Sequence, residues 1–445
     1  MLFALTFLVI TSTLARPWQP TDACPEHIKA IMQGDPCTSY GRKCDDTPQL
    51  QTMDSIHSAL SNCPNITSLD LHISGPDCTG WPDRRNFPFK PEGGEIYPRL
   101  KSLRLTRYYF DKSKEEPWGP PRWIHYPHWR SRLARWKHSL ARWNRDIWTW
   151  LSEGDGLRWV QYKLLPQEQR RKSNFALWMD AMDASGIEEL SIDEMTQEMV
   201  EKFPALLTSL RILESTSLPF IQALPNNTLT NLTWIGRAQP EDLSMILAHQ
   251  GSSLQHLEFR CPELWCPSFT PGYDISILLS NTKDLKSLSI DIPRNGTWPL
   301  EHLEAIASIP TLEKAELYLN IQSLCRQQYP KDYSAEWVEY RRTDNCKGED
   351  QFQKPYLDGN SALKLFKHMK EHKKGAELGE VTFWLGDWSP PWDGPLYVPP
   401  WAEGRRGKVV CKADIGEALE NPCTLIYGEK YWEKEYATYE DLDDW

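Results

Sequence analysis

The stretch Leu254-Gln-His-Leu257-Glu-Phe259 contains the pattern that decides the fold. Its apolar residues have the spacing L-x-x-L-x-L, and polar residues stand between them. Alternate side chains of a strand point to opposite faces, so Leu257 and Phe259 face one way, and Leu254 adds an anchor from the preceding turn. The hexad therefore predicts a short strand with one buried face.

The same spacing recurs ten times when other apolar residues are allowed. The ten hexads are Ile66-Leu69-Leu71, Leu100-Leu103-Leu105, Leu157-Val160-Tyr162, Ile187-Leu190-Ile192, Leu207-Leu210-Ile212, Leu229-Leu232-Trp234, Leu254-Leu257-Phe259, Leu285-Leu288-Ile290, Leu312-Ala315-Leu317 and Leu378-Val381-Phe383. Apolar residues at three- and four-residue spacing predict helices between them, over residues 52–60, 240–249, 274–280, 300–308 and 360–373. Alternating strands and helices predict stacked repeats that share one core.

With this repeat, the chain resembles the leucine-rich repeat superfamily over roughly residues 63–390, and in particular the irregular arrays of the ribonuclease-inhibitor and F-box-associated kind. It also looks like a secreted fungal leucine-rich repeat protein. The resemblance implies an α/β fold, namely a leucine-rich repeat solenoid with a curved parallel sheet, outer helices and disulfide-stapled caps. The spacing is irregular, since first anchors lie 20 to 66 residues apart. A compact α/β domain of unrelated βα units stays open as the alternative.

The predicted organisation has four parts. A signal peptide (1–15) and an N-terminal cysteine-rich cap (16–62) come first, followed by the array (63–390) and by a C-terminal cap with an acidic tail (391–445). Insertions at 106–154 and 320–360 interrupt the array. Terminal repeats need closed ends, and insertions often carry binding.

The N-terminus predicts secretion to the extracellular space or the cell wall. The apolar run from Leu2 to Ile10 precedes Thr13-Leu14-Ala15, the pattern of a secretory leader. No later segment is long and apolar enough to predict a transmembrane helix. Sequons at four asparagines predict glycosylation: Asn65, Asn226, Asn231 and Asn295. An intracellular adaptor whose leader is misread stays open as an alternative.

Eleven cysteines favour an oxidising compartment. Six form local pairs that predict disulfides: Cys261 with Cys266, Cys325 with Cys346, and Cys411 with Cys423. The connectivity of the other five cannot be deduced from spacing; they are Cys24, Cys37, Cys44, Cys63 and Cys78.

Composition excludes two classes of protein. An apolar fraction of 40% with 21 tryptophans excludes an intrinsically disordered chain. A net charge of −11, from 50 basic and 61 acidic residues, argues against a nucleic-acid ligand.

The outward side chains of the hexads predict a concave binding surface for a protein or glycan ligand. Its candidate residues are Arg104, Trp159, Lys163, Asp193, Arg211, Glu258, Arg260, Tyr318 and Trp384. Trp388 and Trp392 continue a tryptophan- and proline-rich stretch that either presents rings to a ligand or caps the array. Asn231 also falls in an outward slot, so a glycan there would displace a ligand from the middle of the array.

A second candidate surface is a basic, tryptophan-rich helix predicted at residues 129–150. Its apolar stripe either packs on the array, lies on an anionic membrane surface or docks an acidic partner.

No catalytic residue, metal or cofactor is predicted. His368-Met-Lys-Glu371-His372 matches the zinc-protease pattern H-x-x-E-H, but five lysines of the same helix disfavour a cation. The sequence thus predicts a secreted, non-enzymatic binding protein. The alternative is a secreted carbohydrate-active hydrolase with its site in the inserted loops.

Overall fold

The structure of the protein is a computed structural model of the whole chain. It describes residues 23–32, 53–73, 87, 89, 94–108, 110, 172–263, 275–294, 296–321, 323, 352–386, 407–413 and 422–429. The chain divides into two compact units. Unit 1 contains residues 1–187 and 196–199, and unit 2 contains residues 188–195 and 200–445. Both units combine helices with parallel strands, so the α/β class is confirmed.

Unit 1 contains parallel strands that are hydrogen-bonded in sequence order. These are β1 (His27–Met32), β2 (Ser68–Ile73) and β3 (Ser102–Thr106). Helix α1 (Met53–Asn62) precedes β2, while α4 (Asn174–Ala181) and the 3-10 helix η3 (Ala184–Gly186) follow β3. A disulfide between Cys24 and Cys63 connects the segment before β1 to the end of α1.

The core of unit 1 is closed by aromatic side chains. Helix α4 begins at the N-cap Ser173, whose hydroxyl accepts a hydrogen bond from the Ala176 N–H, and it buries Phe175 and Trp178. The hydroxyl of Tyr108 accepts hydrogen bonds from Trp178 Nε1 at 3.0 Å and from the backbone N–H of Phe87 at 3.2 Å. These bonds satisfy polar groups that burial would otherwise leave unpaired.

Unit 2 contains a longer run of strands, again hydrogen-bonded in sequence order. Seven are mutually parallel: β4 (Glu189–Ile192), β5 (Ile212–Glu214), β6 (Asn231–Ile235), β7 (His256–Arg260), β8 (Ser287–Ile292), β9 (Lys314–Leu319) and β10 (Glu380–Leu385). Two antiparallel strands follow, β11 (Gly407–Lys412) and β12 (Cys423–Tyr427). A disulfide between Cys411 and Cys423 links them.

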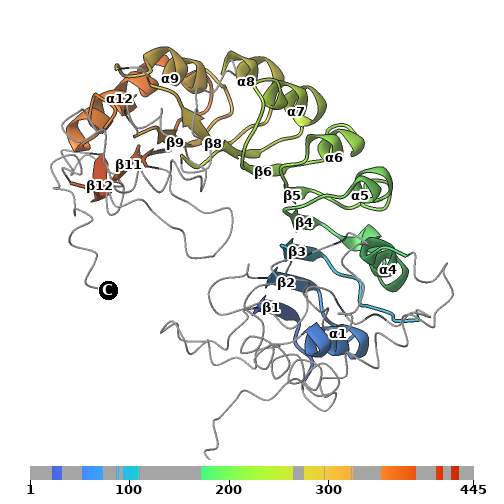
Figure 1. Cartoon of the computed structure of the whole chain (residues 1–445). Helices are drawn as coiled ribbons and strands as arrows, with labels where there is room; N and C mark the ends of the chain where they lie inside the picture. The colour runs from blue at the N-terminus through green and yellow to red at the C-terminus, as the bar shows by residue number, and fades with distance from the viewer. Residues whose placement is uncertain are drawn as a thin grey trace, which may run out of the picture. The chain divides into compact units, whose positions relative to one another are not determined.

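Helices of unit 2 lie along one side of its strands (Figure 1). They are α6 (Leu218–Ala223), α7 (Asp242–Gln250), α8 (Ser276–Asn281), α9 (Leu300–Ala307) and α12 (Gly359–His372); α5 (Gln197–Lys202), which precedes β5, has residues in both units. Each covers one strand face with apolar side chains, so the opposite face of the sheet carries the polar positions of the hexads. Among the described residues, no helix is both long and apolar enough to cross a bilayer.

Stacked hexads form the core of unit 2. The register aligns Leu232, Leu257, Leu288, Ala315 and Val381 across five neighbouring strands, and all are buried. Each large aliphatic side chain buried in this way contributes about 1.5–3 kcal/mol. Because a single repeat cannot cover its own apolar face, this alignment is what stabilises the unit.

The prediction for one hexad is wrong. Leu207-Leu210-Ile212 predicted Ile212 inside, but Ile212 is 38% exposed and Leu213 is fully buried. Strand β5 pairs Leu213 with Leu190 and with Leu232, so the true anchors begin at Leu210. Leu207 is also buried, in the turn before the strand. Because Leu207, Leu210 and Leu213 lie three residues apart, the L-x-x-L spacing fits two registers of the hexad. Pairing with both neighbouring strands fixes the register.

Several predictions lie outside the described residues. These are the leader, the third hexad, the basic helix at 129–150, Asn295, and the cysteines at 37, 44, 78, 266, 325 and 346. Most of both insertions lies there too. Strand β1 falls within the predicted N-terminal cap, and β11 and β12 fall within the predicted C-terminal cap. The predicted domain bounds stay predictions.

Candidate binding surface

Four of the predicted binding residues lie close together in unit 2. Glu258 and Arg260 are on β7, Tyr318 is on β9 and Trp384 is on β10. Their neighbours Phe259, Leu317 and Phe383 point into the core, so these four side chains lie on the sheet face opposite the helices.

The other predicted residues do not join them. Arg104 is on β3 in unit 1, and Asp193 is exposed just after β4. Arg211 precedes β5, because the buried anchor of this strand is Leu213 and not Ile212. Its Nη1 donates a hydrogen bond to the backbone oxygen of Leu210 at 3.0 Å. Trp159, Lys163, Trp388 and Trp392 lie outside the described residues.

Register places the clustered residues in one row across the strands. Tyr318 pairs with Trp384, Trp384 with Lys408, and Lys408 with Tyr427. Side chains at paired positions on neighbouring strands are close enough to contact one another. A row of this kind therefore brings rings and cationic groups of β9 to β12 into contact.

Two cationic groups flank a pair of stacked rings in this row. The guanidinium of Arg260 lies over the Tyr318 ring, 4.8 Å from its centroid. The rings of Tyr318 and Trp384 are stacked, with centroids 5.6 Å apart and an interplanar angle of 2°. Lys408 Nζ lies 4.1 Å from the centroid of the Trp384 ring. We call Arg260, Tyr318, Trp384 and Lys408 the ladder; its contacts are cation–π and offset aromatic interactions.

Two carboxylates orient the ladder from the adjacent row. Glu258 Oε1 accepts a hydrogen bond from Arg260 Nε at 2.6 Å, and Glu316 Oε2 accepts one from Trp384 Nε1 at 3.2 Å. The Arg260 side chain is only 7% exposed, so its ion pair with Glu258 is poorly screened by solvent. The ladder is thus held in one geometry before any ligand arrives.

A row of ion pairs lies next to these carboxylates, one row further from the ladder. Glu380 contacts Lys314 Nζ at 3.2 Å and Lys412 Nζ at 3.3 Å, and Glu316 contacts Lys314 at 3.1 Å. Partial burial alone would raise the pKa of Glu380, but its bonds to the two lysines hold that pKa below the ordinary value. Burial would likewise lower the pKa of Lys314, yet Glu316 and Glu380 raise it above the ordinary value.

Exposure increases along the ladder from β7 to β12. Arg260 and Tyr318 are 7% and 9% exposed, Trp384 and Lys408 are half-buried, and Tyr427 is 39% exposed. Tyr427 contacts the Trp384 ring at a centroid distance of 6.2 Å. The accessible end of the surface is therefore made by Trp384, Lys408 and Tyr427.

Lys408 and Tyr427 were not among the predicted residues. They follow the predicted array and belong to antiparallel strands, which the hexad spacing does not describe. The short apolar run of Val409, Val410 and Cys411 between two lysines was the available signal, since β-branched residues favour strands.

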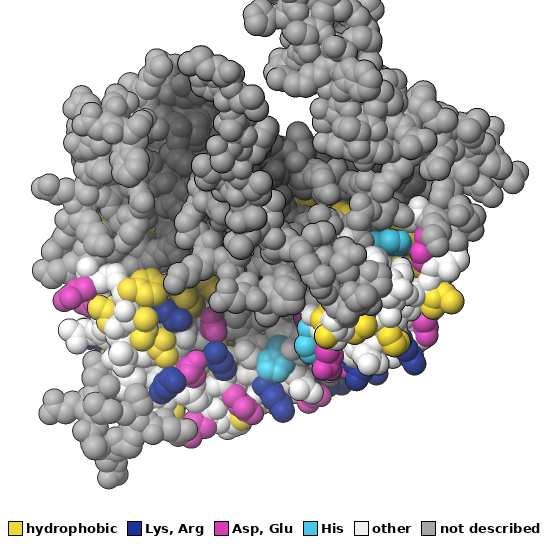
Figure 2. All heavy atoms as spheres, turned by 90° about the horizontal axis from the view of Figure 1, so that it is seen from below, with side chains coloured by type: hydrophobic (Ala, Val, Ile, Leu, Met, Phe, Trp, Pro, Cys, Tyr) yellow, Lys and Arg dark blue, Asp and Glu magenta, His cyan; other side chains and the backbone are white. Residues whose placement is uncertain are grey.

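Charge on the described surface is mixed. Figure 2 shows basic and acidic side chains of the described residues interspersed on one face of the molecule. A polyanion such as nucleic acid is bound by a continuous basic surface, and the described part of this face has none.

The predicted glycan acceptors differ in position. Asn65 and Asn226 are exposed and lie outside the strands, where a glycan has room. Asn231 is half-buried on β6 and pairs with His256 of β7. A glycan at Asn231 would therefore lie on the sheet face near β6, four strands away from β10.

No family model matches the chain, and no curated protein does. One similar solved structure is the leucine-rich repeat-containing protein LegL7 from Legionella pneumophila, with 13% sequence identity and a TM-score of 0.24. The match covers 36% of this chain and 62% of that chain, which is less than two thirds of its length. A similarity of this size carries no structural inference, so the functional assignment depends on the surface itself.

Proposed function

We propose that the protein is a secreted, non-catalytic binding protein of the leucine-rich repeat superfamily, and that a protein ligand docks at the β10–β12 end of the ladder. The observation that carries this proposal is the preorganised row of Arg260, Tyr318, Trp384 and Lys408 on the sheet face opposite the helices. Tryptophan, tyrosine and arginine are the residue types that dominate binding energy in protein interfaces.

The ladder favours a protein over a sugar. Arg260 and Trp384 come from strands on either side of β9, so they occupy opposite faces of the Tyr318 ring. Tyr318 and Lys408 cover the two faces of Trp384 in the same way. A sugar ring stacks on a free aromatic face, whereas a protein can use the ring edges, the Tyr427 hydroxyl and the Lys408 ammonium group.

The superfamily assignment is supported by the register of unit 2. Hexads of the predicted spacing coincide with β4 and with β6 to β10, and each is followed or preceded by a helix on the same side. Secretion is supported by the disulfides Cys24–Cys63 and Cys411–Cys423 of the described residues, because disulfides persist in oxidising compartments.

The test is a selection of displayed random peptides against the full chain, run in parallel with a glycan array. We expect peptides whose affinity falls about 30-fold or more in Trp384→Ala and in Tyr427→Ala, the size of an interface hot spot. Leu279→Ala is the matched control, since Leu279 is a 43% exposed apolar residue on α8, on the helix side. Peptides that bind the Trp384→Ala and Tyr427→Ala variants unchanged, or hits confined to glycans, would refute the proposal.

A second experiment tests secretion. Peptide mapping of the protein recovered from culture medium is expected to show a chain that begins after residue 15 and carries glycans at Asn65 and Asn226. A glycan at Asn231 is compatible with docking at β10–β12 but not with docking at β6 and β7. A chain that retains Met1 would contradict secretion.

A further inference from the structure

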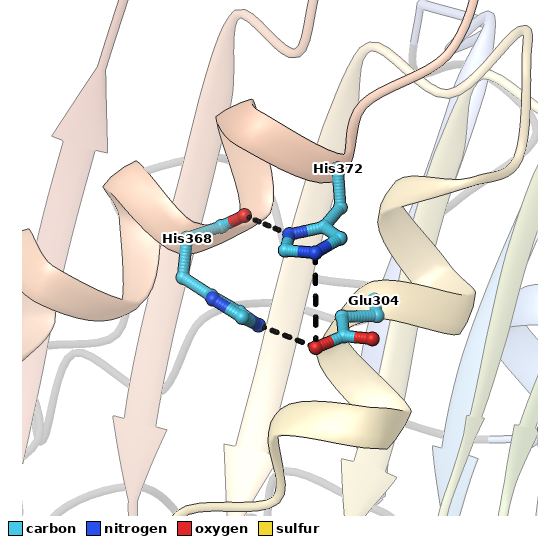
Figure 3. Close-up of side chains that lie close together, drawn as sticks. All are labelled: Glu304, His368 and His372. Carbon is cyan, nitrogen blue, oxygen red and sulfur yellow. Dashed lines mark hydrogen bonds and ion pairs between the residues drawn. The ribbon is translucent and has the colours of Figure 1, made fainter.

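Three potential metal ligands converge on the helix side of unit 2, away from the ladder. Glu304 lies on α9, while His368 and His372 lie one turn apart on α12, which packs against α9 (Figure 3). Glu304 Oε1 is 2.9 Å from His368 Nε2 and 3.9 Å from His372 Nε2. One ligand atom from each residue lies within 4.8 Å of the other two, and all three residues are half-buried.

The tautomer of His372 leaves a free lone pair that faces this cluster. Its Nδ1 is 2.9 Å from the backbone oxygen of His368, and because a carbonyl oxygen only accepts, Nδ1 carries the hydrogen and donates it. In neutral His372, Nε2 is then an acceptor, yet it faces a carboxylate oxygen of Glu304. A metal cation between the two acceptors would satisfy both, as would a proton on Nε2 or a bridging water, and the titration below distinguishes the metal from these alternatives. A hydrogen bond from Nδ1 to a backbone carbonyl is also how proteins commonly orient a histidine ligand.

The spacing fits a small transition-metal ion. Zinc binds histidine nitrogen and carboxylate oxygen at about 2.0–2.2 Å, which separates tetrahedral ligand atoms by about 3.4 Å. The observed 2.9 and 3.9 Å bracket that value, and all three ligand atoms lie within 4.8 Å of one another, so the site needs only small side-chain movements to form. Two imidazoles and one carboxylate are a known ligand set for zinc, with a fourth position left to water.

The lysines of α12 do not abolish this fit. Lys370 Nζ pairs with Glu377 at 3.3 Å, and Lys373 Nζ donates to the backbone oxygen of Ile309, so both ammonium groups are engaged elsewhere. Lys364 and Lys367 are exposed, where solvent screens their repulsion. Glu301, one turn before Glu304, adds a negative charge on α9.

We infer that Glu304, His368 and His372 form a binding site for a divalent transition-metal ion of the zinc class. The bound ion links α9 to α12. It thereby fixes the position of α12, the helix at the end of the second predicted insertion. Glu371, the acid of the H-x-x-E-H pattern, is exposed and is not a ligand. The acid that completes the site comes instead from a residue 64 positions before His368.

The experiment is calorimetric titration of zinc into the full chain after chelation and dialysis, with the same titration on single-residue variants. We expect one equivalent of zinc to bind, and His372→Ala and Glu304→Gln each to weaken binding by more than about 100-fold, beyond the loss caused by removing an outer-shell partner. His302→Ala on α9 and Glu371→Gln on α12 are matched controls and are expected to leave the affinity unchanged. Unchanged affinity in His372→Ala would place the zinc elsewhere and overturn the assignment.

Hydrogen exchange separates loss of the site from loss of the fold. At a free zinc concentration of about 100 times Kd, amides of α9 and α12 that exchange by opening the site are expected to exchange about 100-fold more slowly. His372→Ala should abolish this zinc effect while keeping the exchange pattern of β7 to β9. If zinc neither binds the wild-type chain nor slows α12, the cluster is only a hydrogen-bonded contact between helices. Cobalt binding gives an independent check, because its visible spectrum reports tetrahedral nitrogen and oxygen ligands.

Discussion

Units 1 and 2 both bury aromatic side chains in their cores, but unit 2 also has stacked rings on the other face of its sheet. In unit 1, Trp178 and Tyr108 are 1% exposed and close the core. In unit 2, aliphatic side chains and rings such as Phe366 and Phe383 fill the core between sheet and helices, while Tyr318 and Trp384 lie on the other face of the sheet. The same residue types therefore fill the cores of both units and, in unit 2, also form the ladder. Position relative to the sheet, and not residue type, decides which of the two roles a ring has.

The largest expected effect is in the aromatic core of unit 1. Trp178→Ala removes a fully buried ring and the partner of the Tyr108 hydroxyl, and we expect it to lower the stability of unit 1 by about 3–5 kcal/mol. Hydrogen exchange of the β2 and β3 amides measures this loss, with the β7 and β8 amides of unit 2 as an internal reference. A loss below about 1 kcal/mol would mean that Trp178 is not a core residue.

The hydroxyl of Tyr108 is expected to have the next largest effect. Tyr108→Phe leaves Trp178 Nε1 and the Phe87 N–H without their acceptor, which lowers the stability of unit 1 by about 1–3 kcal/mol. Trp234→Phe in unit 2 is the matched control. Trp234 is also buried, but its Nε1 is the buried side-chain polar atom that has no hydrogen-bond partner among the described residues, so no bond is lost there. Since Trp234→Phe also removes ring volume, it is compared with Trp178→Phe, and equal losses from these two substitutions would contradict a contribution of the Tyr108–Trp178 hydrogen bond.

Alkaline pH is expected to destabilise unit 1 through Tyr97. Burial first, and then the charges of Tyr108 and Glu95, raise the pKa of Tyr97 above its ordinary value of 10.0. The contribution of Tyr97 to folding stability is therefore fully present below about pH 10. Above that pH the Tyr97 hydroxyl of the unfolded chain ionises, and the free energy of unfolding falls by up to about 1.4 kcal/mol per pH unit. Urea denaturation on either side of pH 10 measures it, and Tyr97→Phe should flatten the slope.

The ladder is expected to contribute little to stability. Trp384→Ala loses the stack on Tyr318 and the contact with Lys408, which together are worth about 1–2 kcal/mol at a half-buried site. Exchange of the β10 amides measures this value. A loss as large as that of Trp178→Ala would remove the difference between the two units and make the ladder part of a core.

The smallest expected effect is at the acid end of the pH scale in unit 2. The folded pKa of Glu380 lies below its ordinary value of 4.5, so its contribution is present above that pH and is lost as pH falls through the lower folded pKa. Ion pairs of this kind contribute a few tenths of a kcal/mol each, and salt should weaken them. Urea midpoints of wild type and Glu380→Gln, compared above and below this pH, test it. An effect that is insensitive to salt would contradict the ion-pair explanation.

Much of the strand pattern of unit 2 was predictable from local spacing. Leu229, Leu254 and Leu285 each begin a hexad that forms a strand in the predicted register, because apolar spacing directly reports which face is buried. The hexad at Leu207 failed because two leucine registers satisfy the same local rule. Only the pairing of Leu213 with both neighbouring strands distinguishes them.

The candidate sites were predictable only in part. Arg260, Tyr318 and Trp384 were recognised as outward positions, but nothing in the spacing indicated that they touch one another. The histidines at 368 and 372 were visible as an i, i+4 pair, whereas Glu304 lies 64 residues before His368 and has no local relation to it.

The sequence by itself determined the repeating strands and helices, the buried face of most of them and the residues available on the outer face. These properties follow from side-chain periodicity, which is local. The tertiary structure decided the register of β5, the addition of β11 and β12 with Lys408 and Tyr427, and the meeting of Glu304 with the two histidines. Those features depend on which repeats stack side by side, and stacking is set by hydrogen-bond pairing and packing between segments that are distant in the chain.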